Sequence, residues 1–332
     1  LASVTKSFTA AVALLLDACG VMPLGTTAAS LVPSASIDPS ATIEDLLRHR
    51  SGIGDWLNDK PWRFDWLVKH PSMAVSPLTV VKSVDHTVRG EYNYSNSGFT
   101  LVTIAAERAT GRPWKELVRT LLLQPLGLTQ TGYGPVATAA RSHWGVGRQL
   151  LPRGSAGWGP TRSVASALRG AGDLFSTPRD LARFGELFWG SRLIDRDGSL
   201  LLNGAAQPNG SGLLYTLGTQ VRRDWDGPIR VYGHTGGFSG TTTAVERVPA
   251  LGITIAAVSN GSPNAYESYA VSLARALLAA LDRPAADPYG VPRPTAVSMG
   301  DPEPPDPPLV RSEEHTSELQ SRQYLVCRLL LE

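Results

Sequence analysis

The stretch Ser3-Val4-Thr5-Lys6-Ser7-Phe8-Thr9-Ala10 opens an apolar-rich segment that runs to Ala18. This pattern predicts a helix that begins at Val4. Ser3 and Lys6 are three positions apart, so their side chains share one helix face with Cβ atoms about 5–6 Å apart. A serine hydroxyl is a poor nucleophile until a neighbouring base takes its proton, and a desolvated lysine can be that base where an arginine cannot. Because the spacing is common, a surface pair is the simpler explanation for it alone.

Two further clusters carry polar chemistry. In Tyr94-Ser95-Asn96, alternate side chains of an extended segment project the same way, so the phenol of Tyr94 and the amide of Asn96 can face one site. The phenol could relay a proton and the amide could hold a substrate carbonyl. In Tyr232-Gly233-His234-Thr235-Gly236-Gly237, glycines at a strand end allow a substrate backbone to approach, and a free N–H there could stabilise an oxyanion. Taken singly, the first is a polar turn and the second a bulge or hairpin.

The local patterns predict an α+β fold. Thr42-Ile43-Glu44-Asp45 has the form of a capping box that opens a helix ending at Gly52, and Thr177-Pro178 should begin another. The expected elements are helices over 97–110 and 266–281 and strands over 214–222, 229–234, 241–248 and 252–259.

Composition excludes several classes of protein. The 332 residues are 42% hydrophobic and 18% charged, which is typical of an ordinary globular chain. A net charge of +2 without a basic block gives no indication of nucleic-acid binding. The apolar run Ala10–Leu16 is far shorter than the ~20 residues of a transmembrane helix. No cluster of metal ligands and no Gly-x-Ser-x-Gly elbow occurs, so we expect neither a metal or other cofactor nor an α/β-hydrolase.

Together and in this order, the three clusters resemble the serine β-lactamase and penicillin-binding-protein superfamily. The branch in question contains class C β-lactamases, D,D-carboxypeptidases, D-aminopeptidases and family VIII esterases. The stretches Leu46–Ile53 and Ala171–Thr177 are also similar to this family, and the similarity extends to about Leu281. The resemblance implies a mostly helical domain packed against an antiparallel sheet flanked by helices, with the site between them.

The resemblance also implies roles for individual residues. Ser3 would be the acylated nucleophile, Lys6 its proton acceptor and Tyr94 the group that moves protons to the leaving group. Asn96, His234, Thr235, Gly236 and Gly237 would bind substrate, a small molecule or peptide, and the N–H groups of Ser3 and Gly237 would form the oxyanion hole. His234 stands where many relatives have lysine, which favours peptidase or esterase chemistry over a dedicated β-lactamase. His49, by contrast, is interpreted as structural.

The domain boundaries follow from the same reasoning. Residues 1–282 are expected to form the hydrolase domain without the helix and two strands that precede the nucleophile in relatives. Residues 283–310 are a proline-rich linker or tail, and residues 311–332 resemble a translated sequencing adapter. Because relatives are mostly exported in bacteria, the same location is expected here. A catalytically inactive relative that binds peptidoglycan fragments or β-lactams is the alternative, and the sequence leaves the acyl group and the oligomeric state open.

Overall fold

The computed structural model describes residues 1–60, 62–133, 162–190, 193, 207–208, 214–222, 231–238, 241–248, 252–259, 276 and 279–280. Its helical elements are η1 (Ala2–Val4), α1 (Thr5–Ala18), α2 (Ala28–Leu31), α3 (Ile43–Leu47), α4 (Trp62–Lys69), α5 (Pro77–Lys82), α6 (Asn96–Thr110), α7 (Trp114–Val118), η2 (Arg119–Leu123), α8 (Arg162–Ala167) and α9 (Pro178–Trp189). Its strands are β1 (Gly132–Tyr133), β2 (Leu174–Phe175), β3 (Gln207–Pro208), β4 (Leu214–Thr216), β5 (Thr219–Arg222), β6 (Val231–Phe238), β7 (Thr241–Val248) and β8 (Ile253–Ser259).

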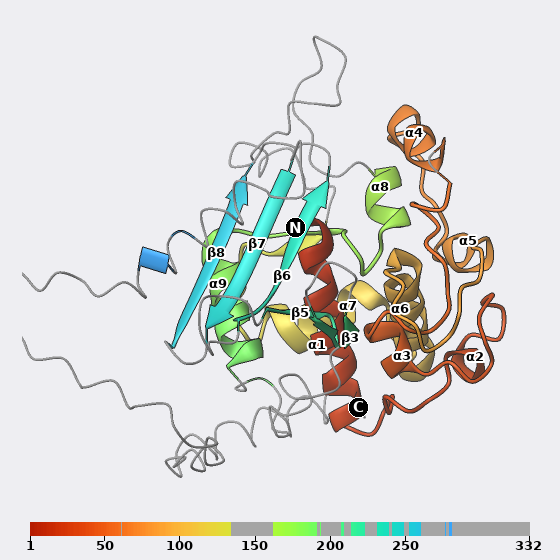
Figure 1. Cartoon of the computed structure of the whole chain (residues 1–332), viewed down its shortest axis with the longest axis horizontal. Helices are drawn as coiled ribbons and strands as arrows, with labels where there is room; N and C mark the ends of the chain where they lie inside the picture. The colour runs from red at the N-terminus through yellow and green to blue at the C-terminus, as the bar shows by residue number, and fades with distance from the viewer. Residues whose placement is uncertain are drawn as a thin grey trace, which may run out of the picture.

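The strands form an antiparallel sheet with the order β3-β4-β5-β6-β7-β8, while β1 and β2 pair separately. In the β6–β7 pair, His234 lies opposite Val245 and Gly237 opposite Thr242. Helix α9 packs on β7 and β8, and the turn η1 packs on β6. Figure 1 shows α1 between this sheet and the helices α2 to α6. The chain therefore has the expected α+β architecture.

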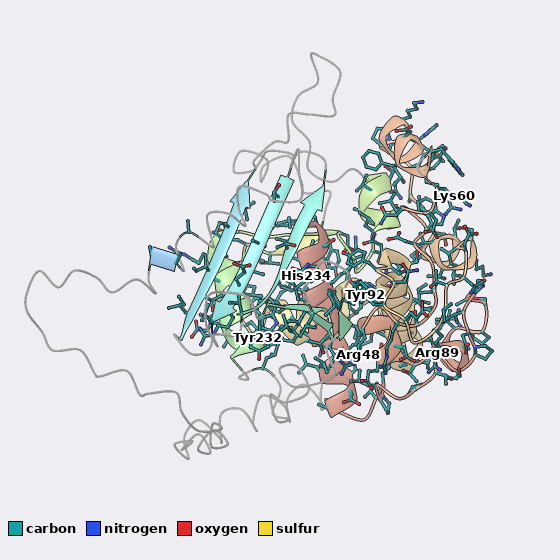
Figure 2. All side chains as sticks on the ribbon, viewed as in Figure 1. Arg48, Lys60, Arg89, Tyr92, Tyr232 and His234 are labelled. Atoms are coloured by element: carbon teal, nitrogen blue, oxygen red, sulfur yellow. The ribbon has the colours of Figure 1, made fainter. Side chains whose placement is uncertain are left out.

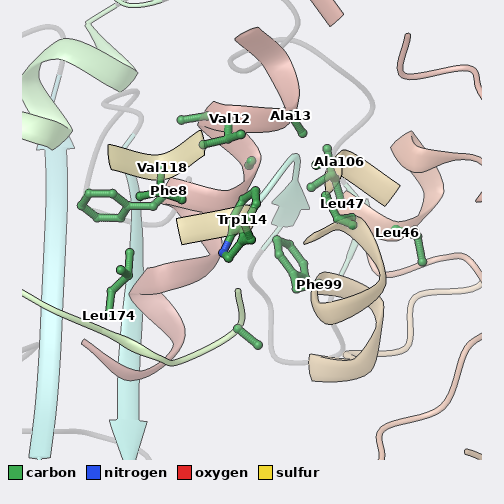
Figure 3. Close-up of a cluster of buried hydrophobic side chains, with 14 of the residues drawn as sticks. Phe8, Val12, Ala13, Leu46, Leu47, Phe99, Ala106, Trp114, Val118 and Leu174 are labelled. Carbon is green, nitrogen blue, oxygen red and sulfur yellow. The ribbon is translucent and has the colours of Figure 1, made fainter. Parts of the chain in front are cut away.

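Helix α1 lies at the centre of the hydrophobic core. Every side chain from Thr5 to Leu16 is buried, because apolar neighbours surround the helix on all sides. On one side the Phe8 ring stacks on Phe184 of α9, with ring centroids 3.8 Å apart. Figure 3 shows Phe8 and Val12 of α1 in the same cluster as Phe99 of α6. The helix that begins beside Ser3 is thus held between α9, which packs on the sheet, and α6 of the helical part.

A turn of the sheet also contacts α1 directly. Gly218, between β4 and β5, has a φ of +62° and accepts a hydrogen bond from Ser7 Oγ at 2.7 Å. A Cβ atom at this position would lie 2.6 Å from the Cβ of Ala10, so only glycine allows the approach. The backbone of the β4–β5 turn therefore packs directly against the N-terminal part of α1.

Most of the elements expected from the sequence are present, and α3 is the main correction among the helices. Its capping box forms as predicted, since Thr42 accepts from the N–H of Asp45 and the Asp45 carboxylate accepts from the N–H of Thr42. The helix ends at Leu47 and not at Gly52, because His49 takes a left-handed φ of +57° that no α-helix accommodates. The predicted helices at 4–18, 97–110 and after Thr177 are confirmed within a residue.

The sheet needs two corrections. The predicted strand 214–222 is two strands, because the turn at Gly218 divides it. The predicted strand 229–234 instead runs from Val231 to Phe238, so the glycines expected at its end lie inside it. The strand over 241–248 is confirmed, and the last one begins at Ile253.

Other expectations fall outside the described residues. These are most of the helix over 266–281, the linker over 283–310 and the adapter-like segment over 311–332. The domain boundaries stay predictions. Across the part of the chain that the structure describes, no helix has both the length and the apolar character needed to cross a membrane.

Candidate active site

The start of α1 brings Ser3 and Lys6 together. Ser3 lies in the turn η1 directly after Ala2, whose φ of +48° is in the left-handed region. Lys6, in the first turn of α1, is 0% exposed, and its Nζ atom is 3.2 Å from Ser3 Oγ. The pair therefore joins a half-buried serine to a desolvated lysine and does not lie on an exposed helix surface.

Two more groups fix the amine of Lys6. Nζ donates to Asn96 Oδ1 at 2.7 Å and to the carbonyl oxygen of Ala171 at 2.9 Å. A neutral amine has two N–H bonds and one lone pair. With both N–H bonds directed at these oxygens, the lone pair of a neutral Lys6 is left for the hydroxyl of Ser3. The geometry suits a base that takes the serine proton.

The protonation states agree with this geometry. Burial lowers the pKa of Lys6 from its ordinary value of 10.5 to about 7, although the attraction of Asp55 and Asp173 opposes the change. Burial also raises the pKa of Tyr94 far above its ordinary value, so the phenol stays protonated. Tyr94 donates this O–H to Ser3 Oγ at 2.8 Å. Ser3 thus has a donor on one side and a potential acceptor on the other.

His49 holds the loop that carries Tyr94. The carbonyl oxygen of His49 accepts from the N–H of Asn93 at 2.7 Å, and its Nδ1 atom accepts from the N–H of Ser95 at 3.1 Å. Its ring centroid is 4.3 Å from that of Tyr94. These contacts agree with the structural interpretation of His49, and they place the Tyr94 ring against Lys6, whose Nζ is 4.7 Å from the ring centroid.

Asn96 is the first residue of α6, where the hydroxyl of Ser95 caps the helix by accepting from the N–H of Gly98 at 3.0 Å. The Asn96 amide donates from Nδ2 to Asp55 Oδ2 at 2.8 Å while its oxygen faces Lys6. Sequence reasoning missed Asp55 and also the carbonyl of Ala171. The available signal was that each lies in or next to a stretch with family resemblance, Leu46–Ile53 or Ala171–Thr177.

Strand β6 runs beside the nucleophile. A Cβ atom on Gly236 would lie 2.3 Å from the carbonyl oxygen of Leu1 and 3.0 Å from the Ser3 nitrogen, so the strand approaches only because this residue is glycine. Gly237 follows and is exposed. The oxyanion hole from the N–H groups of Ser3 and Gly237 stays a prediction.

The side chains of His234 and Thr235 both form hydrogen bonds within the protein. His234 is 1% exposed; its Nδ1 is 2.6 Å from the carbonyl oxygen of Thr235 and its Nε2 is 3.0 Å from the Tyr215 hydroxyl. Since a carbonyl only accepts, Nδ1 carries the proton and Nε2 accepts from Tyr215. Figure 2 shows His234 at the side of α1. Thr235 Oγ1 bonds Gln220 Oε1 at 3.3 Å. Substrate binding by His234 and Thr235 stays a prediction.

Within the described ranges, no group of three or more His, Cys, Asp or Glu side chains is placed to hold a metal ion. Two polar groups contact Ser3 Oγ, the amine of Lys6 and the hydroxyl of Tyr94, and Asn96 contacts Lys6. A serine held between a buried lysine and a tyrosine hydroxyl is an arrangement in which a neighbouring base can activate the hydroxyl as a nucleophile.

The chain belongs to the Beta-lactamase family, whose profile matches residues 1–280. Members of this family are generally serine hydrolases that act on amide and peptide bonds. The chain is 27% identical over 289 residues to penicillin-binding protein 4 of Amycolatopsis lactamdurans, covering 78% of this chain and 71% of that protein. It is 25% identical over 269 residues to penicillin-binding protein 4* of Bacillus subtilis, covering 74% of this chain and 57% of the relative.

Solved structures share the fold. The D-amino acid amidase of Ochrobactrum anthropi SV3 superimposes with a TM-score of 0.70 at 24% identity, over 84% of this chain and 85% of the amidase. A penicillin-binding protein from Bacillus halodurans superimposes with a TM-score of 0.65 at 22% identity, over 84% of each chain. The match of the family profile confirms the family resemblance predicted from the sequence, and the solved structures confirm the fold.

Proposed function

We propose that this chain hydrolyses an amide, peptide or ester through a covalent acyl-enzyme on Ser3. The observation that carries the proposal is the buried Lys6, whose Nζ lies 3.2 Å from Ser3 Oγ and whose pKa burial lowers to about 7. A lysine of ordinary pKa would hold its proton at neutral pH and could not act as a base.

The proposed steps use two groups that both contact Ser3 Oγ. Lys6 takes the Ser3 proton as Oγ attacks the substrate carbonyl, so a C–O bond forms and the C–N or C–O bond to the leaving group breaks. The leaving group receives its proton from Tyr94, which regains one from Lys6. Water then attacks the acyl-enzyme, loses its proton along the same path and releases the acid and Ser3. The N–H groups of Ser3 and Gly237 would stabilise the oxyanion in both steps.

Covalent labelling tests the nucleophile. A fluorescent fluorophosphonate should label the chain at Ser3, with a rate that rises with pH and reaches half its maximum near pH 7, where half of the Lys6 side chains are neutral. Ser3→Ala should abolish labelling. Ser30→Ala, on an exposed serine that only bonds the carbonyl oxygen of Thr27, is the matched control and should label normally. Labelling that persists in Ser3→Ala would refute the proposal.

Labelling with a fluorescent penicillin separates a hydrolase from the alternative of an inactive binding protein. A binder would retain a fluorescent penicillin reversibly, without a bond that survives denaturation. The hydrolase should instead form an adduct and then turn over. Comparing D-amino acid amides, D-alanyl peptides, a chromogenic cephalosporin and short-chain esters as substrates would identify the acyl group. We expect amides and esters to be preferred over the cephalosporin, because position 234 holds histidine where many relatives have lysine.

The cellular location is a separate proposal. The relatives are bacterial penicillin-binding proteins and, in Escherichia coli, a D-alanyl-D-alanine-carboxypeptidase/endopeptidase that matches over 31% of this chain. An exported enzyme would meet such substrates outside the cytoplasm. Fractionation of bacteria that express the complete gene would test this, and recovery in the cytoplasm alone would contradict it.

A further inference from the structure

Asp55 lies in the loop between α3 and α4 and is 3% exposed. Its Oδ2 atom accepts from the Asn96 N–H at 3.2 Å, from Asn96 Nδ2 at 2.8 Å and from Asn58 Nδ2 at 2.8 Å. Its Oδ1 atom accepts from the N–H groups of Leu57 at 3.0 Å and Asn58 at 3.4 Å. Each of these donors is uncharged. The hydrogen-bonding capacity of the carboxylate is satisfied, but its charge is not neutralised by any of them.

The carboxylate decides which way the Asn96 amide faces. The oxygen and nitrogen of an asparagine amide are nearly the same size, so the neighbouring groups select the orientation. An ionised carboxylate only accepts hydrogen bonds, so the NH2 group must face Asp55. The amide oxygen then faces Lys6, which donates to it at 2.7 Å. A reversed amide would place two N–H bonds against the amine.

The negative charge of Asp55 also acts on Lys6. Burial lowers the pKa of Lys6, and the attraction of Asp55 is the largest effect that opposes it. Without that attraction the ammonium form would be still less stable in this desolvated position. The amine must carry a proton between accepting it from Ser3 and passing it on, so some stabilisation of the ammonium form serves the reaction.

We propose that Asp55 is a positioning residue for the Ser3 site: through the Asn96 amide it orients Lys6, and its charge supports the protonated amine. The proposal rests on the function proposed for Ser3 and Lys6. A purely structural role is the simpler alternative, because the bonds from Leu57 and Asn58 also close a turn of the loop. A structural residue would change stability when replaced and would leave the titration of Lys6 as it was.

Nuclear magnetic resonance can measure that titration without any assay of activity. The chain has five lysines, so ¹³Cε-lysine labelling gives few signals, and Lys6→Arg identifies the signal of Lys6. Asp55→Asn should lower the pKa of Lys6 by on the order of one unit, because an opposite charge in its surroundings is removed. Asp59→Asn is the matched control: it removes the same charge four residues later, from an exposed side chain. It should leave the pKa of Lys6 unchanged.

A second variant keeps the test decisive if Asp55→Asn fails to fold. Exchanging the two residues, Asp55→Asn with Asn96→Asp, preserves the hydrogen bond between them but brings the carboxylate against Lys6. The pKa of Lys6 should then rise above that of the unmodified chain. A Lys6 pKa that is unchanged in Asp55→Asn, that moves equally in Asp59→Asn, or that does not rise in the exchange variant overturns the proposal.

The two proposals can fail separately. In the fluorophosphonate assay, the pH at which labelling reaches half its maximum should follow the measured pKa of Lys6 in each variant that keeps Asn96. If the unmodified chain is not labelled, the proposed function is wrong, whatever the titration shows. If it is labelled but the pKa of Lys6 does not depend on Asp55, only the positioning role is wrong.

Discussion

Two carboxylates ten residues apart, Asp45 and Asp55, are equally buried at 3% exposure but have different surroundings. Asp45 closes the capping box of α3 and binds two guanidinium groups, Arg50 Nε at 2.7 Å and Arg89 Nη2 at 2.8 Å. In the described part of the chain, each group that donates a hydrogen bond to the Asp55 carboxylate is an amide N–H. Burial alone therefore does not indicate what a carboxylate does.

The charge of the donors makes the difference. The arginines neutralise Asp45 where it lies, so its effect is confined to the loop that it ties together. The amide donors to Asp55 carry no charge, so they leave its field to act on Lys6. Variants at the site beside Asp55 should consequently lower activity, whereas variants at Asp45 should lower the stability of the fold.

The largest effect is expected for Lys6→Met, which removes the amine and keeps an unbranched side chain of similar length. Acylation of Ser3 should slow by about 10⁴-fold, the upper end of what a general base contributes. Lys6→Arg should not restore the rate, because arginine keeps the charge but cannot accept the proton. The measurement is the rate constant for fluorophosphonate labelling, with thermal unfolding to verify the fold. Rapid labelling of either variant would remove Lys6 from the mechanism.

Tyr94→Phe should have the next largest effect. It keeps the ring against His49 but loses the O–H that donates to Ser3 Oγ at 2.8 Å. We expect kcat/KM to fall by about 10²-fold, and more for an amide than for an ester because the leaving amine needs a proton. Tyr92→Phe is the control, since it removes a hydroxyl from the neighbouring ring. Equal losses in the two variants would show that the effect is not specific to Tyr94.

On the other side of the comparison, Asp45→Asn should reduce stability and leave the labelling rate of the folded protein unchanged. The expected loss is about 1.5–3 kcal/mol in the free energy of unfolding at neutral pH, the range for hydrogen bonds to a charged group. Urea unfolding measures it. A change in the labelling rate at a temperature where the variant is folded would contradict the division of roles.

The stability loss from Asp45→Asn should also depend on pH. Burial acts to raise the pKa of Asp45, but hydrogen bonds from the Thr42 N–H, Arg89 and Arg50 outweigh it and hold the pKa below its ordinary value. A carboxyl with a depressed pKa in the folded state contributes stability above its unfolded pKa, about 3.9, and loses it as the pH falls through the folded value. The difference in the free energy of unfolding between Asp45→Asn and the unmodified chain should therefore become smaller as the pH falls below about 4.

The smallest effect is expected at the surface. Lys60 and Asp85 form an ion pair at 3.0 Å with both side chains exposed, and Figure 2 shows Lys60 on the outer side of the helical part. Asp85→Asn should change the free energy of unfolding by less than about 1 kcal/mol, and by less still in high salt. Urea unfolding at two salt concentrations measures this change. A loss as large as that of Asp45→Asn would show that burial does not explain the different contributions of Asp45 and Asp85 to stability.

The sequence predicted those features that local periodicity determines. The Ser3–Lys6 pair follows from helix spacing, and the capping box at Thr42 follows from the preference of its residue types. The division of 214–222 into two strands was not predicted, although Gly218 is a turn residue with a φ of +62°. What the local sequence does not encode is the contact of this turn with α1.

The site shows the same limit. Tyr94 and Asn96 were found because a resemblance connected them to Ser3, but nothing local indicates that Asp55 binds the Asn96 amide. The burial of His234 depends on Tyr215, a residue on another strand. Such partners are set by how strands and helices pack, which residue spacing along one segment does not encode.

The contact between Ser7 and Gly218 has a consequence for how the protein folds. The two residues are 211 positions apart, so the helix that carries the nucleophile is completed by a turn that is synthesised much later. Closing a loop of this length costs conformational entropy before any contact repays it, and folds with many such contacts form slowly. During refolding, reactive Ser3 should therefore appear together with the last tertiary structure, and a nascent chain that has not yet emerged beyond Gly218 carries an unfinished site.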